Sequence, residues 1–276
     1  MRPHIVKWHG SSSMFLDEPQ TIAVSHGVLG RYGGSSAAGA DKNEDGAYIW
    51  IDAESDLEFV LLLDAHETDE SAQLILSYID GAASEIAGIL REPIEQCFQN
   101  LHDYLLGMLT SERFREDCRG IAGETSCLLC CRREEYVWWF NVGDCLLYLL
   151  HPELTALGQT LLNQRNFYEW IGKVNTFDKQ VPCYSTGVRE LRSGKNVIVL
   201  STDGALELGP LFLEDMKQLF DADLENGVKD FMQMSHERGI KDSVTMIAWQ
   251  VELGHHPSYP SDDSRQEKHA RQIELR

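Results

Sequence analysis

The most constraining feature of the sequence is the order in which strand-like and helical apolar patterns follow one another. Strand-like runs at 21–29, 47–52 and 59–63 precede two consecutive helical patterns, and further strand-like runs come after them. The first helical pattern covers 68–90, where apolar residues recur every three or four positions, and the second begins after Pro93. Helices in adjacent pairs argue against a doubly wound parallel sheet, in which helices alternate with strands. We therefore expect an α+β fold, a four-layer αββα sandwich of two antiparallel sheets flanked by helices.

The second half of the chain again combines strands and helices. Runs at 126–133, 136–142 and 145–150, the last after a Gly-Asp turn, predict an antiparallel meander. The segment 151–192 has a weak pattern and is interpreted as a lobe or flap, with a short helix at 163–170. The remaining predicted elements are a strand at 196–204, helices at 210–220 and 228–236, and a final strand at 242–253.

The chain is interpreted as one domain followed by a tail. Residues 1–253 are expected to form the domain, and residues 254–276 are polar and are expected to be a mobile tail. His255 and His256 lie in this tail, and we expect them to be exposed to solvent rather than to bind a metal.

The net charge and the short apolar runs argue against nucleic acid and membrane as partners. Acidic residues outnumber basic ones by 44 to 24, a formal charge of -20, which repels nucleic acid and anionic membrane. The longest apolar runs have five or six residues, and a helix that spans a bilayer needs about 20. The first 18 residues lack the apolar stretch of a signal peptide. We therefore expect a cytoplasmic protein that binds neither nucleic acid nor membrane.

The cysteines could indicate a disulfide framework, a zinc site or a redox site. The seven cysteines are an odd number and several lie in strand-like runs, so reduced thiols are favoured over a disulfide framework. Cys127 and Cys130 have the C-x-x-C spacing of a zinc or redox site. A zinc site would need a second pair, and a redox motif would open a helix, so buried structural cysteines are the favoured interpretation.

Acidic residues stand at the points where apolar strands begin or end. They are Glu44, Asp45, Asp64, Asp144, Asp203 and Asp242. Any one of them alone is compatible with ordinary turn chemistry. If the strands lie side by side, however, several of these carboxylates meet at one edge, where like charges require cations. Oxygen-only ligands suit magnesium or manganese better than zinc, and two such ions can share a carboxylate and activate water for attack on a phosphoryl group.

In their order and with their neighbours, these acids resemble the motifs of the metal-dependent protein phosphatases of type 2C, in their bacterial form. The resemblance covers about 21–253 and rests on NEDG at 43–46, LLLDAH at 61–66, GETS at 123–126, NVGD at 141–144, LSTDG at 200–204 and DSVT at 242–245. It implies an enzyme that hydrolyses phosphoserine and phosphothreonine with two manganese or magnesium ions. A phosphorylated protein would then be the substrate partner.

The resemblance also implies a role for each residue. The metal ligands would be Glu44 through water, Asp45, Asp64, the Ala65 carbonyl, Asp144, Asp203 and Asp242. Asp64 would bridge the two ions, and Asp144 with Asp203 would hold a weaker third ion. Water between the ions would attack phosphorus directly, without a phosphoenzyme, and His66 would protonate the leaving alkoxide.

The sequence departs from the family motifs at two functional points. The Gly-His-Gly-Gly stretch that follows the bridging aspartate is AHET here, at 65–68. The arginine that grips the substrate phosphate is replaced by Ala40, and Lys42 and Arg31 are the candidates to take its place. Two alternatives therefore stay open: a non-catalytic protein that keeps the fold and binds phosphoproteins, and a hydrolase of small phosphate esters that would differ only in the lobe at 151–192.

Overall fold

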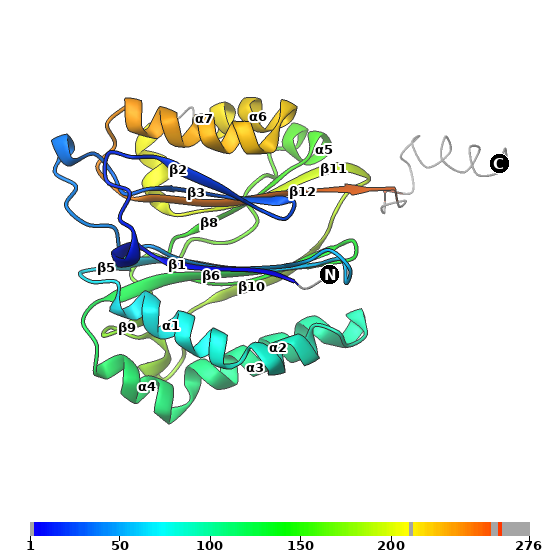
Figure 1. The fold of residues 1–276 in the computed structure, drawn as a ribbon. Helices are drawn as coiled ribbons and strands as arrows, with labels where there is room; N and C mark the ends of the chain where they lie inside the picture. The colour runs from blue at the N-terminus through cyan, green and yellow to red at the C-terminus, as the bar shows by residue number, and fades with distance from the viewer. Residues whose placement is uncertain (1–2, 210–211, 255–258, 261–276) are drawn as a thin grey trace.

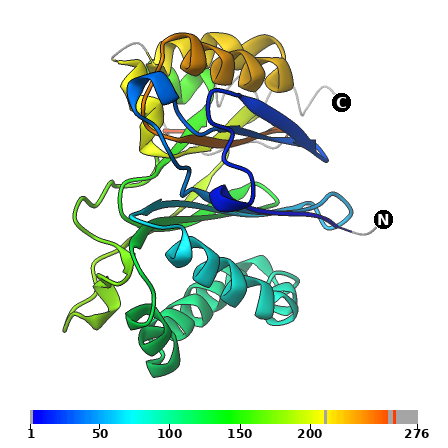
Figure 2. The ribbon, with the colours of Figure 1, turned by 60° about the vertical axis from the view of Figure 1, so that its left-hand side comes forward.

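The computed structural model describes residues 3–209, 212–254 and 259–260 of the chain. Two sheets lie face to face at its centre, and helices cover the outer face of each sheet (Figure 1). The same layers are visible after a turn of 60° about the vertical axis (Figure 2). The predicted αββα sandwich is therefore confirmed.

The first sheet has seven strands, in the order β1-β4-β5-β6-β7-β10, with β9 paired to β6. Its strands are His4–His9 (β1), Gly46–Asp52 (β4), Leu57–His66 (β5), Glu124–Arg133 (β6), Tyr136–Val142 (β7), Ile171–Gly172 (β9) and Ser185–Glu190 (β10). All of its neighbouring strands are antiparallel.

The second sheet has five strands, in the order β2-β3-β12-β11-β8. Its strands are Gln20–Val24 (β2), Gly27–Tyr32 (β3), Leu146–Leu150 (β8), Gly194–Ser201 (β11) and Val244–Leu253 (β12). Its pairings are antiparallel as well.

The helices fall into two groups. The helices on the first sheet are Glu70–Gly81 (α1), Ala83–Ile89 (α2), Ile94–Thr110 (α3) and Glu112–Arg119 (α4). The helices on the second sheet are Phe212–Ala222 (α6) and Leu224–Glu237 (α7), and a short helix, Pro152–Ala156 (α5), follows β8 (Figure 1). Apolar side chains fill three layers between these elements: the first sheet and its helices, the two sheets, and the second sheet and its helices.

Strand β5 shows why a continuous apolar run suits this architecture. Leu61 and Leu63 pack toward the helices, whereas Val60 and Leu62 pack toward the second sheet. Successive side chains of a strand point to opposite faces, and both faces are buried here. The strand therefore holds Asp64 at its end on a rigid, fully packed backbone.

The predicted meander is wrong in its third strand. β6 and β7 form an antiparallel pair, but β8 leaves their sheet and pairs with β11. The outer edge of β7 is taken by β10 instead. The turn at Gly143 and Asp144 is consequently a crossing between the two sheets, which brings Asp144 to the space between them.

The predicted helix at 163–170 is also wrong, because this part of the chain runs beside β8 instead. Leu162 donates its backbone N–H to the Leu147 carbonyl, and Asn166 donates to the Gly143 carbonyl, both at 2.8 Å. Backbone groups that are satisfied by a neighbouring strand have no need of a helix. From β9 onward the lobe joins the first sheet, through β9 and β10.

Other boundaries differ in detail. The predicted helix at 68–90 is two helices, α1 and α2, which meet at Ala82, and the predicted strand at 21–29 is the hairpin of β2 and β3. Strand β1 and helix α4 were not predicted from the sequence. His255 and His256 lie outside the described residues, as does most of the predicted tail.

All seven cysteines are free, and six of them are buried. Cys127 packs toward the helices, whereas Cys130 packs between the two sheets, so the two thiols lie on opposite faces of β6. Two side chains on opposite faces cannot share a metal ion, and the prediction of buried structural cysteines is confirmed. Within the described ranges, no helix is both long and apolar enough to cross a membrane.

Candidate functional site

The predicted acids converge at one edge of the sandwich. Asp45 directly precedes β4, Asp64 lies near the end of β5, Asp203 follows β11, and Asp242 precedes β12. These strand ends lie at the left of Figure 1. Burial raises the pKa of Asp64, and the charges of Asp45, Asp203, Asp242 and Asp144 raise it further, so the five carboxylates form one electrostatic cluster.

Asp45 is the most enclosed member of the cluster, with no exposed surface. Its carboxylate accepts hydrogen bonds from Ser243 Oγ at 2.8 Å and from Thr245 Oγ1 at 2.6 Å. Its pKa is raised from an ordinary 3.8 to about 7, chiefly by burial, with a further contribution from the charges of Asp242 and Asp203, and the two hydroxyls oppose the shift. The hydroxyls come from the DSVT stretch, and sequence reasoning did not assign them a role.

Asp64 lacks the support that Asp45 has. It is 6% exposed, and its carboxylate accepts no hydrogen bond from any described residue. Burial raises its pKa well above the usual range, and the neighbouring acids add to this effect. A buried carboxylate with no donor and several like charges around it is the group that a cation would stabilise most.

Asp203 and Asp144 have a counterion that sequence reasoning missed. Arg165 Nη2 lies 3.0 Å from Asp203 Oδ2, and Arg165 Nε donates to the Asp144 carbonyl at 2.9 Å. Burial and the charges of Asp144 and Asp242 raise the pKa of Asp203, and Arg165 lowers it. Arg165 is a single arginine in a weakly patterned segment, so neither spacing nor periodicity in the sequence could identify it.

A polar cavity of about 350 Å³ adjoins the cluster, and of the five aspartates Asp242 lines it. Its lining includes Lys42, Glu44, Ala65, His66 and Asp242 among the predicted residues, and also Glu207, Lys241 and Ser243. His66 is exposed, and its charge would lower the pKa of both Asp203 and Asp242, so the imidazole faces these two acids. Glu207 anchors the segment that leads into β12, because its Oε2 accepts the backbone N–H of Lys241 at 2.8 Å.

The two candidate phosphate ligands lie in different environments. Lys42 lines the cavity, where its Nζ donates to Glu44 Oε1 at 2.5 Å and to the Glu67 carbonyl at 3.0 Å. Arg31 is absent from the cavity lining and is 8% exposed. Its guanidinium lies 4.4 Å from the centre of the Phe15 ring, which is a cation–π arrangement. The structure brings Lys42 to the cavity and does not bring Arg31 there.

Glu67 occupies a backbone conformation that suits glycine. Its φ is 73°, in the left-handed region, at the position where the family motif has the second glycine of Gly-His-Gly-Gly. Glu67 therefore holds a conformation in which its Cβ crowds the backbone and a glycine would not.

We expect Glu67→Gly to stabilise the protein by up to about 1 kcal/mol, because glycine adopts this φ without a clash at Cβ. Glu67→Ala removes the same charge and keeps Cβ, and it should give no such gain. Urea unfolding of the two variants measures the difference. Equal stability of the two variants would show that the left-handed backbone carries no strain.

The cluster is not assembled into a coordination shell. Across the described part of the chain, no group of three or more His, Cys, Asp or Glu side chains is arranged to hold a metal ion. The pKa shifts nevertheless show that the acids interact. Asp45 and Asp203 bond to hydroxyls and to a guanidinium, with which a cation would compete. The donor set consists of oxygen atoms, and Asp64 accepts no hydrogen bond from a described residue, so the set fits a hard divalent cation.

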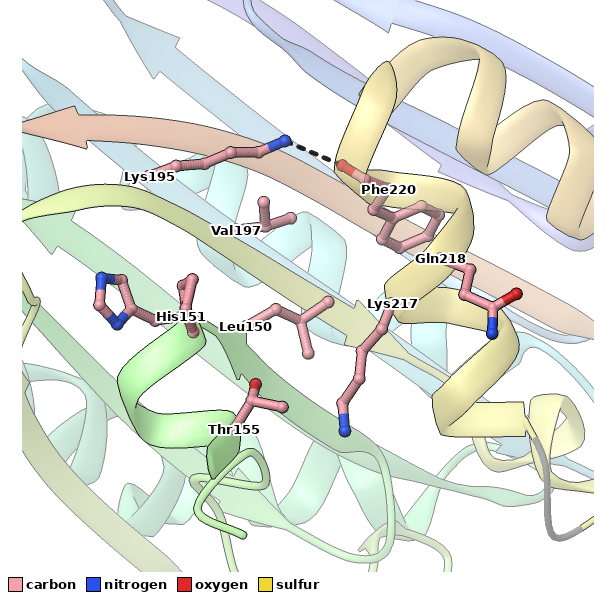
Figure 3. A pocket seen from close by; sticks show the side chains of 9 residues that line it. Leu150, His151, Thr155, Lys195, Val197, Lys217, Gln218 and Phe220 are labelled. Carbon is pink, nitrogen blue, oxygen red and sulfur yellow. Dashed lines mark hydrogen bonds between the residues drawn. The ribbon is translucent and has the colours of Figure 1, made fainter. Parts of the chain in front are cut away.

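A larger cavity lies away from these acids (Figure 3). It measures about 460 Å³ and lies between α5, α6 and the β8 edge of the second sheet. Leu150, Val197 and Phe220 give it a largely apolar wall, and Lys195 Nζ donates to the Phe220 carbonyl at 3.1 Å. No carboxylate among the residues with described side chains lines it, so size alone does not identify the site of chemistry.

Comparisons with known proteins agree with the fold. No protein-family model matches the sequence, and no curated protein matches it in a sequence search. A bacterial serine phosphatase superposes with a TM-score of 0.62 at 17% identity, over 83% of this chain and 99% of that one. The serine/threonine phosphatase Stp1 from Staphylococcus aureus gives 0.59 at 15% identity, over 91% and 96%. RsbX, in a crystal structure with magnesium, gives 0.54 at 11% identity, over 84% and 100%. The chain thus has the αββα fold of the bacterial serine/threonine phosphatases, and its predicted likeness to the type 2C phosphatases is confirmed at the level of the fold.

Proposed function

We propose that the protein is a metal-dependent phosphoprotein phosphatase that hydrolyses phosphoserine and phosphothreonine. The observation that carries the proposal is the Asp64 carboxylate, which is buried without a described donor among four other acids. The residues that follow it, Ala65 and His66, line a polar cavity together with Asp242. Such a cluster is electrostatically costly unless it binds cations. The likeness of the fold to bacterial serine/threonine phosphatases supports the same function.

Two manganese or magnesium ions are the proposed cofactors. The residues that would hold them are Asp45, Asp64, Asp203 and Asp242, with the Ala65 carbonyl and with Glu44 through water. The magnesium in the structure of RsbX supports a divalent ion in a protein of this fold. When bound, two such ions lower the pKa of water and neutralise the charge of a phosphoryl group.

The remaining residues would bind and orient the substrate. The exposed imidazole of His66 faces the cavity beside Asp242, from where it could protonate a leaving alkoxide. Lys42 and Lys241 line the same cavity and supply positive charge for a phosphate. A lysine offers a point charge and not the two-pronged grip of arginine, so we expect phosphate to be held weakly.

A non-catalytic binding protein is the second candidate. The observation in its favour is that Arg165 already neutralises Asp203, one of the proposed metal ligands. Ala40, in place of the phosphate-binding arginine of the family, points the same way.

Hydrolysis of p-nitrophenyl phosphate and of a phosphothreonine peptide tests the proposal, with manganese, with magnesium and with a chelator. We expect metal-dependent turnover that is lost in Asp203→Asn, and faster hydrolysis of the peptide than of the small ester. A preference for the small ester would indicate a hydrolase of small phosphate esters. No turnover above the mutant, in protein that binds manganese, would reject the enzyme and favour the binding protein.

A further inference from the structure

Arg165 lies between two acids that were expected to bind a metal. Its Nη2 is 3.0 Å from Asp203 Oδ2 and 3.9 Å from Asp144 Oδ2. Its Nε donates to the Asp144 carbonyl at 2.9 Å, and the other oxygen of Asp144 accepts Ser126 Oγ at 2.7 Å. One guanidinium therefore supplies the positive charge for both carboxylates.

The position of Arg165 is fixed by the surrounding chain. Its guanidinium lies 4.6 Å from the centre of the Phe167 ring. On the N-terminal side, Asn163 accepts the backbone N–H of Leu147 and donates to the Cys145 carbonyl, both at 2.8 Å. On the C-terminal side, Asn166 is bonded to the Gly143 carbonyl. The arginine is thus anchored to the crossing that carries Asp144, and it is 20% exposed.

We propose that Arg165 is a built-in counterion that takes the place of a third divalent ion between Asp144 and Asp203. The inference concerns the same cluster as the proposed function and rests on it for the choice of manganese as the probe. A guanidinium stays charged at every accessible pH, so its positive charge between the two carboxylates does not depend on pH. A divalent ion placed between the same oxygens would have to displace it, and like charges at this distance repel.

This arrangement divides the cluster into two parts. Asp203 and Asp144 are neutralised by the chain itself, whereas Asp64 has no described donor and Asp45 has only hydroxyls. We therefore expect two metal ions to bind on the Asp45 and Asp64 side, where Asp242 and the Oδ1 oxygen of Asp203 would complete the ligand set, because Arg165 pairs with Asp203 Oδ2. The Asp144 carboxylate is then a partner of Arg165 and Ser126 and binds no ion.

Counting bound manganese ions tests the inference without any substrate. The full chain is titrated with Mn²⁺ by isothermal calorimetry, and free Mn²⁺ is followed by electron paramagnetic resonance. Arg165→Gln should bind one more ion per chain than the wild type, and Arg165→Gln/Asp144→Asn should lose that additional ion. Arg165→Lys keeps the charge and should bind as the wild type does. Arg189→Gln is the matched control, an arginine of the same lobe that bonds Gln159 Oε1 at 3.4 Å.

A second variant, Asp144→Asn, tests the inference independently if Arg165→Gln does not fold. Asp144→Asn in the wild-type background should leave the number of bound ions unchanged, because Asp144 binds none. Loss of an ion in that variant, or the same count in Arg165→Gln and wild type, would overturn the inference. A wild-type chain that binds no manganese, with one ion gained in Arg165→Gln, would support the counterion role and reject the proposed metal-dependent enzyme. The experiment can therefore reject the counterion role of Arg165 and the metal-dependent phosphatase independently of each other.

Discussion

Asp64→Asn is expected to abolish metal-dependent hydrolysis and, in the same molecule, to stabilise the metal-free fold. The substitution removes the charge that would hold the ions, and we expect turnover to fall by at least about a thousandfold. It also removes a buried carboxylate that accepts no hydrogen bond from the described residues and faces four other acids. Asparagine has nearly the same shape and no charge, so the cost of burying the anion disappears.

The raised pKa of Asp64 determines how the stability of the metal-free protein changes with pH. The pKa of Asp64 is raised in the folded chain, so the folded state keeps a proton that the unfolded state loses. The metal-free protein should therefore lose stability as the pH rises above about 4. For Asp45, whose pKa is raised from 3.8 to about 7, the loss continues to about pH 7 and is on the order of 4 kcal/mol.

Thermal unfolding in a chelator measures the effect. At pH 8, Asp64→Asn should melt at least about 4 °C above the wild type, and at pH 4 the two should melt together. Asp41→Asn is the matched control, since Asp41 lines the same cavity but is exposed. Added manganese should raise the melting temperature of the wild type and leave that of Asp64→Asn unchanged. Equal melting temperatures at pH 8 in chelator would show that Asp64 is not strained by its neighbours.

The sequence predicted the structure correctly where a local pattern of apolar and polar residues is compatible with a single structure. The run from Phe59 to Leu63 is apolar at every position, which requires a strand buried on both faces, and β5 is such a strand. The paired helical patterns excluded alternation of helices and strands, and the two antiparallel sheets agree with this. Acids at strand ends were likewise visible in the sequence, because turns and strand limits have clear composition.

The sequence did not predict the pairing of a segment where two neighbouring strands could satisfy its backbone hydrogen bonds equally well. Strand β8 is as apolar as β7, and nothing in its composition shows that it pairs with β11 across the sandwich. The lobe is similar, because its backbone hydrogen bonds run to β8 and not within a helix. Arg165 and Thr245 complete the cluster through such long-range contacts, so their roles became visible only once the strands were assembled.

Glu58→Gln is expected to be among the most destabilising single substitutions in the chain. Glu58 has no exposed surface and Arg132 is 2% exposed, and they face each other across β5 and β6. Arg132 Nε and Nη2 each lie 2.5 Å from one carboxylate oxygen, and His26 Nε2 lies 2.7 Å from Glu58 Oε1. The substitution leaves the guanidinium with a single charged partner, the exposed Asp56, whose Oδ1 lies 2.7 Å from Arg132 Nη1. Breaking a buried ion pair by removing one partner typically costs about 3–5 kcal/mol.

The matched control is an ion pair of the same kind on the surface. Glu112 is 62% exposed and pairs with Arg115 at 2.6 Å, and Glu112→Gln should cost less than about 1 kcal/mol. Urea unfolding at pH 7 measures both variants, with the change for Glu58→Gln several times the larger. The double substitution Glu58→Leu/Arg132→Met should recover most of the loss, because it removes both charges and keeps the volume.

Metal binding separates this pair from the cluster at the other end of the same strand. Glu58 stands six residues before Asp64 on β5, a distance of roughly 20 Å along an extended strand. We expect folded Glu58→Gln to bind manganese as the wild type does, although it unfolds more easily. A change in metal affinity would show that the pair positions Asp64, and an unfolding free energy within 1 kcal/mol of the wild type would show that water reaches Arg132 in the folded protein.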